Sequence, residues 1–133
     1  MRDANYRLQD LGLFRQCSYD PHITAGVVIA AQDRPAPGRR PQAAIWNGAW
    51  TLIPDQALGC QWSEVLGGRA DLFVGFLVPS GSPNTPSRAA LWVWEAGDWD
   101  LTELPQPDGT QWTIANAIDA AGNRIVGQCG NAQ

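Results

Sequence analysis

The chain has 133 residues, 44% of them hydrophobic and 17% charged, and this composition is typical of one globular domain spanning residues 1–133 and excludes a disordered chain. The net charge of −4, with no lysine in the sequence, argues against a nucleic-acid partner, and no apolar run is long enough to cross a membrane. The polar N-terminus lacks the apolar core of a secretion signal, so we expect the cytoplasm as the default location.

Residues 6–42 contain the first strand-like segments, at 6–12, 18–19 and 26–30, and end in a proline-rich connector at 32–42. The chain has 14 glycines and 10 prolines, which interrupt helices and mark turns. We therefore expect short strands and frequent reversals.

Residues 43–88 begin with the clearest hairpin signal in the chain. Segments 43–46 and 49–53 flank Asn47-Gly48, the dipeptide most typical of a two-residue type I′ turn, in which both residues take positive φ. Further strands are expected around 61–63 and 72–75, before a second proline-rich connector at 78–88. This unit reads as four short strands.

Residues 89–128 repeat the same order of segments. Ala43-Ala44-Ile45-Trp46 returns after 46 residues as Ala89-Ala90-Leu91-Trp92, and Gln61-Trp62-Ser63 returns after 50 as Gln111-Trp112-Thr113. Segment 72–75 returns after 52 residues as 124–127. Ala96-Gly97 replaces Asn47-Gly48 as a turn, and 119–123 reads as the turn between strands at 112–118 and 124–128.

Repetition at this period predicts an all-β fold of four-stranded antiparallel blades, with full units at 43–88 and 89–128 and a partial unit at 6–42. Because propellers close with about four to eight blades, this chain can form only a partial β-propeller. Two chains around a twofold axis would close a ring of about six blades, so a homodimer is expected. The alternative is a single β-sandwich or a flattened barrel.

The pattern resembles the HAF-type repeat, a family of β-propeller blade repeats. The segments that carry the resemblance are Arg88-Ala89-Ala90-Leu91-Trp92, Gln9-Asp10-Leu11-Gly12, the strand at 112–119 and the closing run at 122–127. The sequence departs from the family at Ala44 and Ala90, where a phenylalanine is usual, and at Gly67-Gly68. The resemblance implies propeller blades and supplies no shared catalytic residues.

Seven tryptophans are the most informative excess in the composition. Five of them have copies in the repeat and are expected to pack between sheets: Trp46, Trp50, Trp62, Trp92 and Trp112. Trp94 and Trp99 belong to a longer hairpin and are the better candidates for exposed stacking surfaces. Asp98 and Asp100 on one strand face, and Arg39 and Arg40 in the first connector, complete the candidate ligand-binding residues.

The sequence contains no signature of a reaction. His22 is the only histidine, no nucleophile elbow or phosphate loop is present, and the three cysteines are widely spaced and expected to be buried, so neither a metal nor a cofactor is expected. The leading hypothesis is therefore a non-catalytic binding module for a carbohydrate or small molecule. The alternatives are a carbohydrate-active enzyme using Asp98, Asp100 or Glu103, and a structural protein with no specific ligand.

Overall fold

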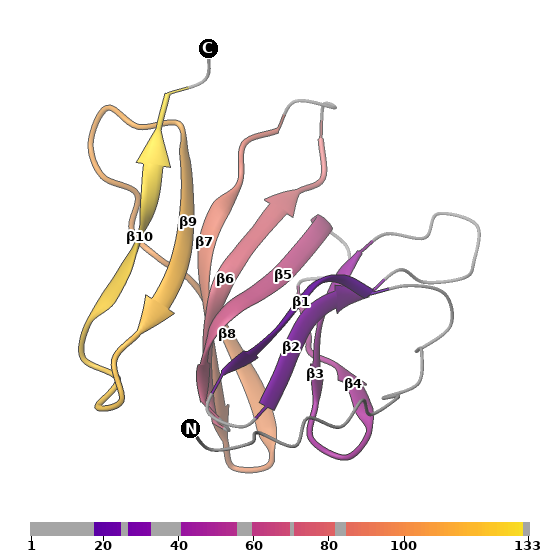
Figure 1. Cartoon of the computed structure of the whole chain (residues 1–133). Helices are drawn as coiled ribbons and strands as arrows, with labels where there is room; N and C mark the ends of the chain where they lie inside the picture. Colours follow the sequence, from indigo (N-terminus) through magenta and orange to yellow (C-terminus); the bar gives the residue numbers. More distant parts are fainter. Residues whose placement is uncertain are drawn as a thin grey trace, which may run out of the picture.

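The computed structural model describes residues 18–24, 27–32, 41–55, 60–69, 71–81 and 85–131. Within these residues the fold is all-β, as the sequence predicted, and every regular element is a strand (Figure 1). The strands are β1 (Ser18–Thr24), β2 (Val27–Gln32), β3 (Gln42–Trp46), β4 (Trp50–Leu52), β5 (Cys60–Arg69), β6 (Leu72–Pro79), β7 (Arg88–Glu95), β8 (Asp98–Glu103), β9 (Trp112–Ile118) and β10 (Ile125–Gly130).

The strands form three separate antiparallel sheets in which chain neighbours are also sheet neighbours. The orders are β1-β2-β3-β4, β5-β6-β7-β8 and β9-β10, and none of these sheets closes into a barrel. In Figure 1 the β1–β4 sheet lies on one side of the β5–β8 sheet and the β9–β10 hairpin lies on the other. The middle sheet is therefore the centre of a three-layer stack.

The inner strands of the middle sheet are covered on both faces, and the sequence of β7 reflects this. Along β7, Ala90 and Trp92 belong to the core shared with the β1–β4 sheet, whereas Ala89 and Leu91 pack in the core shared with β9–β10. Successive side chains of a strand point to opposite faces, so a strand covered on both sides needs apolar residues at every position. This explains the unbroken apolar run Ala89-Ala90-Leu91-Trp92.

The type I′ turn predicted at Asn47-Gly48 forms instead at Ala96-Gly97. Trp46 pairs with Trp50, so Asn47, Gly48 and Ala49 form a three-residue loop, and of these three only Gly48 has a positive φ, 114°. The predicted two-residue turn at Asn47-Gly48 is therefore wrong. The cross-strand pairing of the two tryptophans sets the loop length here, and the local turn preference does not.

Ala96 and Gly97 make the two-residue turn instead. Glu95 pairs with Asp98, and φ is 52° at Ala96 and 84° at Gly97, the type I′ geometry whose twist matches that of the flanking strands. At 119–123 the predicted turn joins β9 to β10, and that prediction is confirmed. Its Asp119 carboxylate accepts the backbone N–H groups of Asn123 (2.7 Å) and Arg124 (3.0 Å), which lower the pKa of Asp119 below its ordinary value.

Candidate functional site

A small cleft opens between the β3–β4 hairpin and the β7–β8 hairpin, whose turns both lie at the lower end of Figure 1. Its volume is about 260 Å³. It is lined by Ile45, Asn47, Thr51, Trp94 and Trp99. The cleft thus brings together both tryptophans that the sequence singled out and adds two polar side chains from the neighbouring sheet.

The two indoles of the cleft form one pair. Trp94 and Trp99 lie directly opposite each other in the β7–β8 ladder, and their rings meet edge to face with centroids 5.2 Å apart. Trp99 also packs against Phe73 of the core, with the two ring centroids 5.6 Å apart. Such aromatic pairs hold each other's ring orientation, so the core fixes Trp99 and Trp99 in turn positions Trp94.

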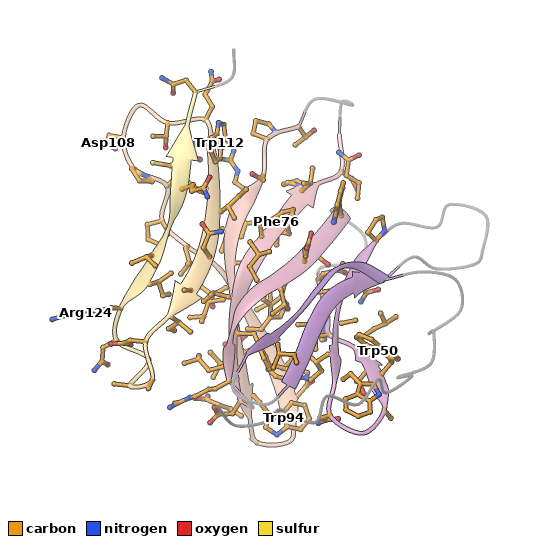
Figure 2. The ribbon with its side chains drawn as sticks, viewed as in Figure 1. Trp50, Phe76, Trp94, Asp108, Trp112 and Arg124 are labelled. Carbon is orange, nitrogen blue, oxygen red and sulfur yellow. The ribbon has the colours of Figure 1, made fainter. Side chains whose placement is uncertain are left out.

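Only one of the two indoles presents a broad surface to solvent. Trp94 is 44% exposed, and Figure 2 shows it at the hairpin end of the sheet. Trp99 is half-buried because it packs against the core between the sheets. The structure therefore gives the two candidates different places, with Trp94 at the surface and Trp99 as its support.

The acidic candidates lie away from this cleft. Asp98 and Asp100 are exposed on the face of β8 opposite to that of Trp99, because neighbouring residues of a strand point to opposite faces. Glu103 pairs with Ala90, a residue of the Trp99 face, and so lies on the other side of the sheet from Asp100. The three carboxylates do not converge. Arg39 and Arg40 lie outside the described residues.

The remaining tryptophans follow the packing prediction with one exception. Trp92 is fully buried, and Trp46, Trp50 and Trp112 are half-buried. Trp62 is 37% exposed and rests against Phe76, with ring centroids 6.2 Å apart, so the prediction of a packed Trp62 is wrong. It lies near the start of β5.

The cysteines also differ from one another in exposure. Cys60 is buried and donates to the Trp62 carbonyl at 3.0 Å, whereas Cys129 is exposed on β10, contrary to the prediction of buried thiols. Cys17 lies outside the described residues. Nowhere in the described ranges do three or more histidine, cysteine or acidic side chains gather as metal ligands would.

A second groove, of about 350 Å³, lies between the end of the β5–β8 sheet and the β9–β10 hairpin. Its walls are mainly apolar, with Ala89, Leu104 and Pro105 on one side and Ala115, Ile125 and Cys129 among the residues on the other. This groove was not predicted directly from the sequence. The signal available was the repeat itself, because the segments of β9 and β10 repeat those of β5 and β6.

A wider, open hollow of about 610 Å³ lies beside the loop that carries Asp108 (Figure 2). Its charged candidate, Arg88, already donates to the side chain of Gln106 and to the Gln111 carbonyl. Because this guanidinium is already bonded to the loop that lines the hollow, the hollow offers less for recognition than the Trp94 cleft and the groove beside β10.

Comparison of the chain with known family models, with curated proteins and with solved structures found no match. In the parts of the chain that the structure describes, no helix has the length and hydrophobicity needed to cross a membrane.

Proposed function

We propose that the protein is a non-catalytic binding module whose stacked sheets act as the blades of an incomplete propeller. The observation that carries the proposal is the exposed face of Trp94 in the wall of a cleft between two hairpins. An indole held in place by a second, core-bound indole offers contact area without a large loss of side-chain entropy on binding. A binding role needs only this rigid surface.

The cleft suits a ligand with one flat, partly apolar ring, such as a monosaccharide unit. Its volume of about 260 Å³ lies below the range of about 300–1,000 Å³ for pockets that enclose drug-sized ligands. Asn47 and Thr51 line the opposite wall and can hydrogen-bond the hydroxyl groups of a sugar whose ring stacks on Trp94. The ligand would therefore lie between the two sheets.

The enzyme alternative gains little from the same geometry. Hydrolysis of a glycosidic bond uses two carboxyl groups on either side of the bond, about 5 to 10 Å apart and facing each other. Asp98 and Asp100 share one exposed face, and Glu103 belongs to the other face of the sheet. An enzyme would need two facing carboxylates, and the described residues that line the cleft include none.

Titration with glucose, galactose, N-acetylglucosamine and cellobiose tests the proposal, with binding measured by isothermal titration calorimetry. We expect saturable binding of at least one of these sugars and a loss of at least about tenfold in affinity in Trp94→Ala. Trp62→Ala is the matched control, because Trp62 is similarly exposed but lies outside the cleft. Equal effects of the two substitutions, or no binding of any sugar, would overturn the proposal.

A further inference from the structure

The groove between the first two sheets is filled by one tryptophan. Trp92, on the third strand of the β5–β8 sheet, is fully buried in the core shared with β1–β4. Its indole Nε1–H donates to the carbonyl of Pro54, just after β4, at 2.5 Å. The third strand of one sheet thus anchors itself to the end of the preceding sheet.

The open groove beside β10 has the same walls as this filled one. Seven residues in or beside the core that holds Trp92 have counterparts in the repeat that line the groove of about 350 Å³. The correspondences are Ala43 with Ala89, Ile53 with Leu104, Pro54 with Pro105, Ser63 with Thr113, Val65 with Ala115, Phe73 with Ile125 and Leu77 with Cys129.

The hydrogen bonds at the two places also correspond. The Ala43 N–H donates to Ser63 Oγ at 2.8 Å, and the Ala89 N–H donates to Thr113 Oγ1 at 2.8 Å. Ile53 donates its N–H to the Ala43 carbonyl at 3.0 Å, as Leu104 does to that of Ala89 at 2.8 Å. The backbone around the open groove therefore has the geometry of the filled one.

Two glycines show the same close approach of strands. A Cβ at Gly75 would lie 1.9 Å from the Glu64 carbonyl oxygen, and a Cβ at Gly127 would lie 2.0 Å from that of Ile114. Both positions thus need glycine for the same reason. The match extends from β5–β6 to β9–β10 along the whole hairpin.

The groove beside β10 lacks only the strand that would carry the tryptophan. Among the described strands β10 pairs with β9 alone, so its outer edge is open, and Figure 1 shows it at the margin of the molecule. No described residue donates a hydrogen bond to the Pro105 carbonyl, which corresponds to the acceptor of the Trp92 indole. An open strand edge and an apolar groove together form a receptor for an extended segment.

We propose that this groove binds an extended segment of another protein that carries an alanine two residues before a tryptophan, as Ala90 precedes Trp92. The segment adds to β10 as an antiparallel third strand and donates its indole N–H to the Pro105 carbonyl. The site continues the existing interface between the β5–β8 sheet and β9–β10, in which Val74, Ala89 and Ala115 are already buried. It is independent of the Trp94 cleft.

The probe for this site is a synthetic peptide of residues 88–95, the sequence of β7, added to the full chain. We expect saturable binding with amide shifts in β10 and around Leu104, and at least a tenfold weaker affinity for the peptide with Trp92→Ala. No saturable binding at millimolar peptide, or equal binding of the two peptides, overturns the proposal.

A pair of protein variants locates the site. Cys129→Arg places a bulky charge at an exposed position in the groove, and Thr102→Arg places one at an exposed position on β8 outside it. We expect at least tenfold weaker peptide binding in Cys129→Arg and unchanged binding in Thr102→Arg. Unchanged binding in both variants overturns the site. Self-association of the chain that Cys129→Arg abolishes would make a second copy the occupant and would also overturn the proposal.

Discussion

Ala96 is the one residue other than glycine with a positive φ among those described, at 52°. Left-handed backbone costs an L-residue with a Cβ about 1–2 kcal/mol, and asparagine tolerates it better because its short polar side chain bonds locally. Ala96→Asn creates the Asn-Gly pair that a type I′ turn prefers. We expect the free energy of unfolding to rise by about 0.5–1 kcal/mol, measured by urea denaturation.

Gly97→Ala is the opposite control, because it puts a second Cβ into the left-handed region, at a φ of 84°. This variant should lose about 1 kcal/mol of stability. A stability gain in both variants, or in neither, would contradict the type I′ assignment at this hairpin.

The dipeptide rule predicts the turn at Asn47-Gly48 and ranks Ala96-Gly97 below it, yet the structure has the reverse. A local preference is worth about 1 kcal/mol, whereas the pairing of Trp46 with Trp50 is set by how the whole strand packs. The exposure of Trp94 could be predicted because its hairpin is longer than the equivalent one. The exposure of Trp62 could not, since it depends on what covers β5.

At the scale of elements, a side-chain hydroxyl links each sheet to the preceding one by a hydrogen bond. Thr113 on β9 is buried and accepts the Ala89 N–H of β7 at 2.8 Å. Thr113→Val keeps the shape of the side chain and removes the acceptor, which leaves a buried N–H unpaired. We expect a loss of about 1–3 kcal/mol in the free energy of unfolding, measured by urea denaturation.

Thr102→Val is the matched control, because Thr102 is exposed on β8 and should change stability by no more than about 0.5 kcal/mol. Ser63→Ala at the equivalent joint should cost at least as much as Thr113→Val, since Ser63 also donates to Asp55 at 2.6 Å. Equal stability of Thr113→Val and Thr102→Val would show that this contact does not hold the sheets together.

Individual strands could be predicted from the sequence, but their grouping into sheets could not. The strands beginning at Ala43 and Ala89 were predictable, because burial on both faces leaves a continuous apolar run. The grouping of strands into sheets was not. The predicted units 43–88 and 89–128 each begin at the third strand of a sheet, whereas the sheets themselves begin at β1, β5 and β9. A repeat in sequence carries no mark of where one sheet ends and the next begins.

At the scale of the whole molecule, the stack has two unlike ends. One end is the four-stranded β1–β4 sheet, and the other is the β9–β10 hairpin with its open edge. Two four-stranded sheets and a hairpin are too few for a closed propeller, which has about four to eight blades. Among the described strands, the outer edge of β10 is the one beside an apolar groove, and it is where we propose that a partner segment adds.

The sequence predicts a homodimer, with a mass twice the 14.4 kDa of one chain, and light scattering over a concentration series measures it. Cys129→Arg tests whether the dimer interface includes the groove beside β10. If the dimer persists in this variant, its interface lies elsewhere and the groove remains available for a separate peptide. If the dimer is lost, the second copy occupies the groove. A monomer at every concentration contradicts the dimer and leaves the peptide titration as the separate test of the proposed partner segment.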